Sequence, residues 1–200
     1  RVLQTLGFQA HGLSARVCWM LPDSTVLPRT HMALQVSVDD KPWLADVGFG
    51  GVTRTGALAM GEIEAQPTPH EHFRLQAEAH GLTTVSVQIA SQWQALYHYS
   101  ADPYLPVDYE TANWYVSTHP QSRFVNQLIC CRADSTGRHT LLNNRYARYR
   151  PGTLPEGEAL SNEGELQVLL RDVFRIRLDG INDLPARLRR MLAEESNAHS

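Results

Sequence analysis

Residues 31–51 read HMALQVSVDDKPWLADVGFGG, and this stretch decides the fold. Apolar and polar side chains alternate over 31–38 and again over 42–49, on either side of Asp-Asp-Lys. Alternation with a period of two is typical of a β-strand, and a short polar connection between two such runs is typical of a hairpin. The stretch therefore predicts two antiparallel strands that turn at residues 39–41.

The register of this hairpin determines which side chains share a face of the sheet. We expect Val38 to pair with Trp43, because this register forms one continuous apolar face from alternate residues of 32–38 and 43–49. Burial of that face should select the register. The opposite face then carries His31, Ala33, Gln35 and Asp46.

A histidine and a carboxylate thus lie on one face, and their contact depends on the register. In the expected register Asp46 lies opposite Gln35, roughly 13 Å along the strand from His31 at about 3.3 Å per residue. Direct contact would require a β-bulge, strong coiling or a different pairing. The glycines of the GFGG run permit such a distortion, so the hairpin alone leaves the contact open.

Other β-rich runs occur at regular spacing on both sides of the hairpin. They cover residues 8–21, 73–79, 82–90 and 93–100. Strands at this spacing predict an antiparallel sheet or a small barrel. Residues 22–30 contain two prolines and predict a loop, whereas the aromatic segment 109–124 has no clear period and is expected to be irregular.

The C-terminal part combines strands with helices. Two strands, 125–133 and 139–150, flank the turn DSTG at 134–137. Two helices follow, the first capped by Ser161 or Asn162 and the second opened by Asp183 and Pro185. Their apolar stripes are Leu166, Leu169, Leu170 and Val173 in the first, and Leu184, Leu188, Met191 and Leu192 in the second.

These elements predict an α+β fold in three parts. Val2, Leu3 and Leu6 have helical spacing before Gly7, so residues 1–7 are expected to be the end of a helix that starts before Arg1. Residues 8–105 are expected to form an antiparallel β-barrel domain. Residues 106–200 are expected to form an α/β lid with C-terminal helices.

Composition limits the classes of function. The chain has 200 residues, 42% hydrophobic and 20% charged, with a formal net charge of −3. Without a basic surplus, nucleic acid is not an expected partner. No apolar run is long enough to cross a bilayer, so no membrane contact is expected.

The cysteines indicate neither a disulfide framework nor a metal site. There are three, Cys18, Cys130 and Cys131, and no Cys-x-x-Cys pair is present. We therefore expect no metal and a reducing, cytoplasmic location. Cys18 lies in an apolar run with no activating group nearby in sequence, so a small buried thiol is its ordinary interpretation.

Several segments together resemble one enzyme family. PRTHMALQV at 28–36 and WLADVGFGG at 43–51 are similar to the central signature of the arylamine N-acetyltransferases, including its histidine-to-aspartate spacing. The resemblance extends over nearly the whole chain, through ARV at 15–17, NWYVSTHPQSRF at 113–124, CCR at 130–132 and ELQVLLRDVFRI at 165–176. The paired central motifs carry most of its specificity.

The resemblance implies a Cys-His-Asp triad of the kind shared with transglutaminase-like and papain-like enzymes. His31 and Asp46 match its histidine and aspartate. The family's cysteine lies in an Arg-Gly-Gly-x-Cys-Phe-Glu motif, which this sequence lacks and which should lie upstream of Arg1. Residues 1–7 would then end an N-terminal helical bundle that is mostly absent here, and the chain alone would lack the nucleophile.

The resemblance also implies substrates and their binding residues. Acetyl-CoA is the expected co-substrate, and arylamines or arylhydrazines are the expected acceptors, with O-acetylation of N-hydroxyarylamines a further activity. Gly50 and Gly51 are expected near CoA, and Thr30, Phe49 and Phe124 near the acceptor. Arg123 and Arg132 are candidates for contacts with CoA phosphates, and solvated surface is the favoured interpretation of each. A second copy of the chain, forming a homodimer, is a candidate partner.

Two other functions remain open at this point. The same triad on a transglutaminase-like or peptidase-like scaffold would hydrolyse amides. Alternatively, the chain could be a non-catalytic barrel that binds small molecules. Exchange of label between acetyl-CoA and CoA would favour acetyl transfer over both.

Overall fold

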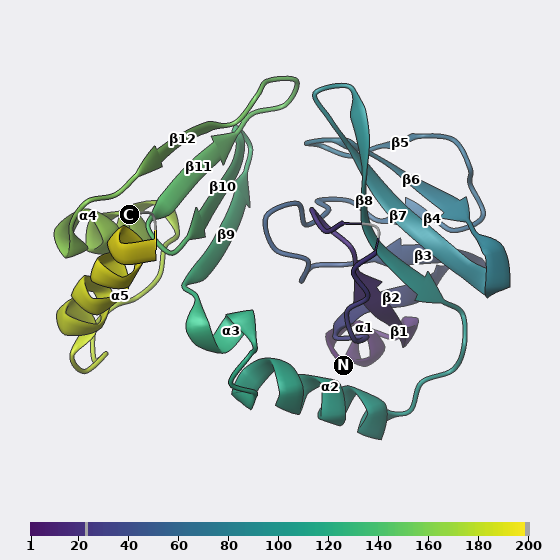
Figure 1. Ribbon diagram of the computed structural model, residues 1–200. Coiled ribbons are helices and arrows are strands. Elements are labelled where there is room, and N and C mark those ends of the chain that lie inside the picture. Colours follow the sequence, from purple (N-terminus) through teal and green to yellow (C-terminus); the bar gives the residue numbers. More distant parts are fainter. Residues whose placement is uncertain (23, 199–200) are drawn as a thin grey trace. The chain divides into compact units, whose positions relative to one another are not determined.

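The computed structural model describes residues 1–22 and 24–198, and it divides into two compact units (Figure 1). The first unit covers residues 1–125 and the second covers residues 126–200. Asp23, which falls in the predicted loop 22–30, lies outside the described residues. Each unit has its own apolar core.

An eight-stranded antiparallel sheet forms the first unit. Its strands occur in the order β4-β3-β2-β1-β8-β7-β6-β5. They are β1 (Gln9–Val17), β2 (His31–Val38), β3 (Lys41–Ala45), β4 (Leu58–Ala59), β5 (Gln66–Pro67), β6 (His72–Ala77), β7 (Leu82–Ile89) and β8 (Gln92–Ser100).

The two edge strands of this sheet meet through one side chain. The Gln66 amide on β5 accepts a hydrogen bond from the Ala59 backbone N–H on β4 (2.7 Å) and donates one to the Ala59 carbonyl (3.0 Å). A side-chain amide thus replaces the missing strand pairing and leaves the barrel nearly closed. The predicted antiparallel barrel within an α+β fold is confirmed.

The central hairpin differs in register from the expectation. Val38 pairs with Lys41 and Val36 with Trp43, so the expected Val38–Trp43 pairing is wrong by two residues. The connection is the two-residue turn Asp39–Asp40, whose φ angles are 50° and 58°. A turn with two left-handed residues matches the twist of a hairpin, and aspartate tolerates this conformation better than most residues.

On the expected apolar face of the hairpin, only Val36 is buried. Met32 and Val47 are exposed (49% and 90%), whereas Ala33 and Leu44 on the other face are fully buried. The inward face of a barrel is determined by all its strands together, which a single hairpin does not reveal. His31 and Asp46 therefore belong to the face that turns toward the core.

Side chains from all the longer strands fill the barrel. Each large apolar side chain that is fully buried contributes about 1.5–3 kcal/mol relative to exposure. The buried cluster consists of Leu13, Ala15, Ala33, Leu44, Val52, Leu58, Phe73, Leu75, Val85, Val87, Leu96, Tyr97 and Tyr99.

Helices of the first unit are few, and one was not predicted. They are α1 (Val2–Thr5), the 3₁₀ turn η1 (Ala79–Gly81), α2 (Pro106–Thr118) and α3 (Arg123–Asn126), which ends at the junction of the units. The expectation of irregular structure over 109–124 is wrong for α2. No residue of α2 is buried, so the helix has no apolar stripe to mark it. Its start is set by Pro106 and by the Asp108 carboxylate, which accepts from the Leu105 N–H (2.8 Å).

The second unit is a four-stranded antiparallel sheet with helices. Its strands occur in the order β12-β11-β10-β9, namely β9 (Ile129–Asp134), β10 (Gly137–Leu142), β11 (Arg145–Tyr149) and β12 (Glu156–Ala159). The predicted single strand 139–150 is wrong, because the chain turns at Asn143, whose φ is 53°. Gly137 has φ 147°, and a Cβ there would overlap the Tyr149 carbonyl oxygen.

Helices α4 (Glu163–Val168) and α5 (Leu184–Ala198), with the π-helical turn η2 (Leu169–Val173), complete the second unit. Asn162 caps α4 by accepting from the Glu165 N–H, and the Glu165 carboxylate accepts from the Ser161 N–H (both 2.9 Å). The buried cluster consists of Leu141, Leu160, Leu166, Leu169, Leu170, Phe174, Leu188 and Leu192.

Candidate active site

His31 and Asp46 are in contact, with 2.8 Å between His31 Nε2 and Asp46 Oδ2. The observed register explains this contact. Leu34 pairs with Ala45, so Asp46 directly after β3 comes level with Ala33, only two residues from His31. The separation along the strand is then about 6.6 Å instead of roughly 13 Å, within reach of two side chains on one face. The two-residue turn therefore brings the pair together without a bulge.

Asp46 is buried and surrounded by donors. Its Oδ1 atom accepts from the Gly48 N–H (3.0 Å), and its Oδ2 atom lies 3.9 Å from Arg54 Nη2. Burial alone would raise the pKa of Asp46. The hydrogen bond from His31, the charges of His31 and Arg54 and the Gly48 amide outweigh burial and hold the pKa of Asp46 below its usual value. Asp46 is therefore a carboxylate at neutral pH.

The His31 ring is held by aromatic neighbours. Phe49 meets it edge-on at 5.4 Å and Tyr97 lies at 4.9 Å, both measured between ring centroids. Because a carboxylate only accepts hydrogen bonds, Nε2 carries the proton that faces Asp46. A neutral ring then has its lone pair on Nδ1, and within the described residues no hydrogen bond occupies that nitrogen.

A cavity of about 180 Å³ borders His31. Thr30 and Ser14 line it from the barrel, and Tyr109, Asn113 and Val116 line it from α2. A histidine that lines a cavity and has one ring nitrogen fixed by a carboxylate is suited to general acid–base chemistry.

The other predicted site residues are less closely grouped. Thr30 lines the His31 cavity and Phe49 packs on the ring, so both lie at the pair. Gly50, with φ 94°, donates its N–H to Thr53 Oγ1 (2.6 Å), and Gly51 begins the next turn. Phe124 lies on α3 with 63% of its surface exposed. The roles of Gly50, Gly51 and Phe124 stay predictions.

None of the three cysteines lines the His31 cavity. Cys18 lines a different cavity, which shares no lining residue with the His31 cavity. Burial raises the pKa of the Cys130 and Cys131 thiols, both in the second unit. A raised pKa disfavours the reactive thiolate.

Sequence reasoning missed two residues of this site, Arg54 and Tyr97. The Arg54 side chain is 2% exposed and donates from Nη1 to the Tyr97 hydroxyl (2.9 Å). Burial raises the pKa of Tyr97 far above its ordinary value, so the hydroxyl stays protonated. Arg54 lies in the segment between β3 and β4, where the sequence has no periodic pattern that would mark a buried cation. A buried carboxylate at position 46 was the one signal that a cation should be near.

Comparisons with known proteins first give the general class. A family model described as N-acetyltransferase matches residues 1–184. The chain is similar to the arylamine N-acetyltransferase of Mycolicibacterium smegmatis, with 38% identity over 190 residues, covering 93% of this chain and 67% of that protein. The chain belongs to the arylamine N-acetyltransferase family.

Other relatives agree. The arylamine N-acetyltransferase / N-hydroxyarylamine O-acetyltransferase of Salmonella typhimurium is 35% identical, over 92% of this chain and 64% of that protein. The solved structure of the Mycobacterium marinum arylamine N-acetyltransferase in complex with CoA has a TM-score of 0.89 and 32% identity, over 95% of this chain and 72% of that one. The chain thus spans about two thirds of the length of these relatives.

Within residues 1–22 and 24–198, none of the helices has both the length and the apolar character needed to span a bilayer.

Proposed function

We propose that the full-length protein containing this chain transfers an acetyl group from acetyl-CoA to the nitrogen of arylamines and arylhydrazines, with His31 and Asp46 as catalytic residues. The observation that carries the proposal is the 2.8 Å contact between His31 Nε2 and Asp46 Oδ2 beside a cavity. The names of the relatives, including one bound to CoA, support the substrates. O-acetylation of N-hydroxyarylamines is a second activity of the same site.

The first half-reaction forms a thioester on a cysteine upstream of Arg1. Nδ1 of His31 accepts the thiol proton, and the resulting imidazolium is stabilised by the Asp46 carboxylate. The thiolate attacks the carbonyl carbon of acetyl-CoA and the bond to the CoA sulfur breaks. CoA leaves as a thiol after it receives the proton from His31.

The second half-reaction returns the cysteine. The amine nitrogen attacks the thioester carbonyl, and Nδ1 of His31 accepts the proton that the amine loses. The carbon–sulfur bond breaks, the amide product leaves and the thiolate is restored beside the imidazolium. Because CoA departs before the amine reacts, ping-pong kinetics are expected.

The remaining predicted residues have binding roles in this proposal. Phe49 offers a ring face beside His31 for an aryl group, and Phe124 is assigned to the same acceptor. Thr30 lines the cavity next to the catalytic histidine. Gly50 and Gly51 allow close approach of CoA to the backbone, because glycine has no side chain in the way.

The test compares the full-length protein with purified residues 1–200. Labelled CoA should exchange into acetyl-CoA in the full-length protein without any amine, and the chain 1–200 should show neither exchange nor arylamine acetylation. Acetylation by residues 1–200 alone would refute an upstream nucleophile. Amide hydrolysis without CoA would instead support a hydrolase.

A further inference from the structure

Arg54 is a buried cation within the catalytic cluster. Its side chain is 2% exposed, and its guanidinium lies 5.9 Å from the ring centroids of both Phe73 and Tyr97. Nη2 lies 3.9 Å from Asp46 Oδ2 and Nη1 donates to the Tyr97 hydroxyl (2.9 Å). Arg54 therefore connects the carboxylate that faces His31 to the tyrosine that packs on it.

Burial of the Arg54 charge costs free energy of folding, which a purely structural role does not explain. Within the described residues, Nε and Nη2 are buried and make no hydrogen bond. A guanidinium cannot lose its charge, and a buried charge needs compensation. Asp46 is the carboxylate that supplies it, so Asp46 is shared between a permanent cation and a titratable one.

We propose that Arg54 is a positioning residue for acetyl transfer. It keeps Asp46 ionised and, through the Tyr97 hydroxyl, holds in place the Tyr97 and Phe49 rings that contact His31. The inference rests on the proposed function and adds a role to the same site.

The chemical need follows from the proposed cycle. His31 alternates between a neutral ring and an imidazolium during the cycle. Asp46 therefore faces a positive charge at His31 in only part of the cycle. A buried carboxylate facing a neutral ring tends to take up a proton, and a protonated Asp46 could donate to Nε2 and reverse the tautomer. The fixed charge of Arg54 keeps Asp46 an acceptor throughout, so the lone pair stays on Nδ1.

The arrangement also constrains the ring. Tyr97 lies 4.9 Å from His31 and 5.5 Å from Phe49, between centroids, so it supports both. The hydrogen bond from Arg54 ties the far end of Tyr97, and the Tyr97 hydroxyl proton remains available to Asp46. Loss of the Tyr97 hydroxyl alone should make the Tyr97 and Phe49 rings beside His31 more mobile, while the Arg54 charge remains.

The experiment follows the protonation of Asp46 and the tautomer of His31 in the full-length protein by NMR, with labelled aspartate carboxyl carbon and labelled histidine ring nitrogen. Among the described residues, the titratable and charged groups that face Asp46 are His31 from β2, Arg54 from the segment after β3 and Tyr97 from β8. Because the charge of Arg54 lowers the pKa of Asp46, Arg54→Met should raise the pH at which Asp46 protonates.

Three further variants separate charge from structure. Arg54→Lys retains a charge and should shift that pH less. Tyr97→Phe retains the ring and the Arg54 charge but removes a hydroxyl that contacts Asp46, so it should shift the Asp46 titration less than Arg54→Met does and should broaden the His31 signals. Arg74→Met is the matched control, because Arg74 lies 4.3 Å over the Trp93 ring of the same barrel and should change neither signal.

The outcomes decide the proposal. An Arg54→Met protein whose Asp46 titrates as in the wild type overturns it, as does an equal shift in Arg74→Met. If Arg54→Met does not fold, Tyr97→Phe still decides, since His31 signals as sharp as in the wild type would refute a role of Arg54 through the Tyr97 hydroxyl. In acetyl transfer, Arg54→Met should move the acid limb of kcat to higher pH, with less effect on KM for the amine. A wild type without acetyl transfer would refute the proposed function, while the NMR result would still decide whether Arg54 controls the pair.

Discussion

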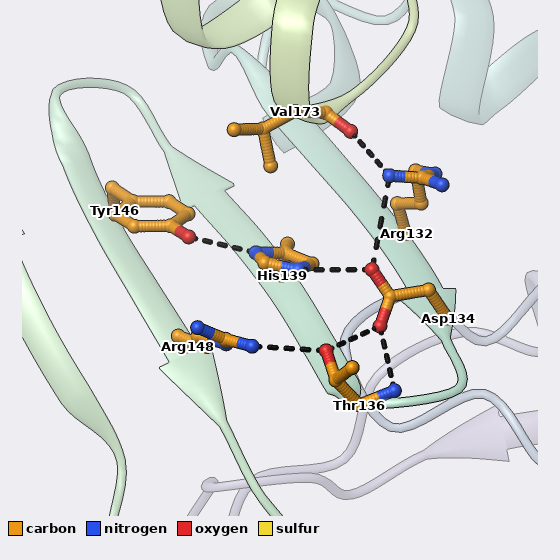
Figure 2. A network of polar contacts seen from close by, with 7 residues as sticks. All are labelled: Arg132, Asp134, Thr136, His139, Tyr146, Arg148 and Val173. Carbon is orange, nitrogen blue, oxygen red and sulfur yellow. Dashed lines mark hydrogen bonds and ion pairs between the residues drawn. The ribbon is translucent and has the colours of Figure 1, made fainter.

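Two histidine–aspartate pairs occur among the described residues, one in each unit, and they differ in what surrounds them. In the first unit Asp46 is 1% exposed at its side chain and lies 2.8 Å from His31. In the second unit Asp134 is 27% exposed and lies 3.3 Å from His139 (Figure 2). Asp134 also accepts from the N–H and hydroxyl of Thr136 at the hairpin turn (2.9 and 2.7 Å).

The decisive difference lies at the second ring nitrogen. Nδ1 of His139 is hydrogen bonded to the Tyr146 hydroxyl (2.7 Å), and the two rings stack (Figure 2). His31 lines a cavity, and among the described residues no hydrogen bond occupies its Nδ1. A general base needs one nitrogen fixed and the other available. The comparison teaches that a histidine–aspartate contact indicates catalysis only where the other nitrogen can meet a substrate.

The network around His139 has a structural explanation. Arg132 on β9 donates from Nη1 to the Val173 carbonyl (2.8 Å), and Arg148 on β11 donates to the Thr136 hydroxyl (2.9 Å). Asp134 and His139 thus lie in a web that joins three strands and the turn η2 (Figure 2). This web stabilises the second unit and leaves no reactive nitrogen.

The largest expected effect is a loss of acetylation activity in variants of the His31–Asp46 pair that variants of the His139–Asp134 pair do not show. In the full-length protein, His31→Gln or Asp46→Asn should lower the rate of arylamine acetylation by about 10³–10⁴-fold, because the base or its orientation is lost. Thiol alkylation at neutral pH should fall in the same variants. Steady-state rates and iodoacetamide labelling measure both.

The matched variants are His139→Gln and Asp134→Asn, which should retain nearly the full rate. A comparable loss in the second pair would contradict the distinction drawn from the ring nitrogens. Unchanged alkylation in both His31→Gln and Asp46→Asn would refute an activated thiolate.

Part of this distinction could be predicted from sequence. Alternation over residues 31–49 predicted the hairpin and one shared face for His31 and Asp46, and the family signature singled out both. The expected register is wrong because it assumes that burial of one alternating apolar face selects the pairing. The two-residue turn at Asp39–Asp40 determines the pairing instead. Sequence distance also hid Arg54, which reaches Tyr97 only after the barrel closes.

The helix α2 shows the same limit for local structure. Its thirteen residues contain no buried side chain, so the pattern has no stripe to detect. The C-terminal helices, by contrast, were predicted with their buried leucines, because each packs one face on its own unit. Local periodicity thus predicts elements that bury a face and misses those that do not.

The next effect concerns stability. Asp46→Ala leaves the buried Arg54 charge without its carboxylate, so the free energy of unfolding of the first unit should fall by about 3–5 kcal/mol. Asp134→Ala removes exposed hydrogen bonds and should cost the second unit about 1 kcal/mol. All four tryptophans, Trp19, Trp43, Trp93 and Trp114, lie in the first unit, so tryptophan fluorescence in urea reports that unit. An unchanged tryptophan transition in Asp46→Ala would argue against a buried ion pair.

A smaller effect appears in acid. Hydrogen bonds from Thr136 and the charge of His139 lower the pKa of Asp134 from 3.8 to about 2. A lowered pKa in the folded state contributes stability that is present above the ordinary pKa and lost as the pH falls through the folded value. The second unit should therefore lose stability between pH 3.8 and about 2, and Asp134→Asn should flatten that slope. Amide signals of β9 and β10 in urea at several pH values measure this, and a slope that persists in Asp134→Asn would assign it to other groups.

The smallest effect tests the second nitrogen itself. Tyr146→Phe removes the hydrogen bond at Nδ1 of His139 and should cost about 1 kcal/mol in the second unit, because the ring stays stacked and only one bond is lost. If an open nitrogen were enough for reactivity, the variant would gain reactivity toward an acylating reagent at His139. We expect no such gain, because the aromatic ring at position 146 still covers the His139 side chain, which is 10% exposed; the His31 side chain is similarly buried (12% exposed) but lines a cavity. Faster acylation of His139 in Tyr146→Phe, followed by mass spectrometry, would show that the tyrosine alone keeps the second pair inert, and that access matters less than the hydrogen bond.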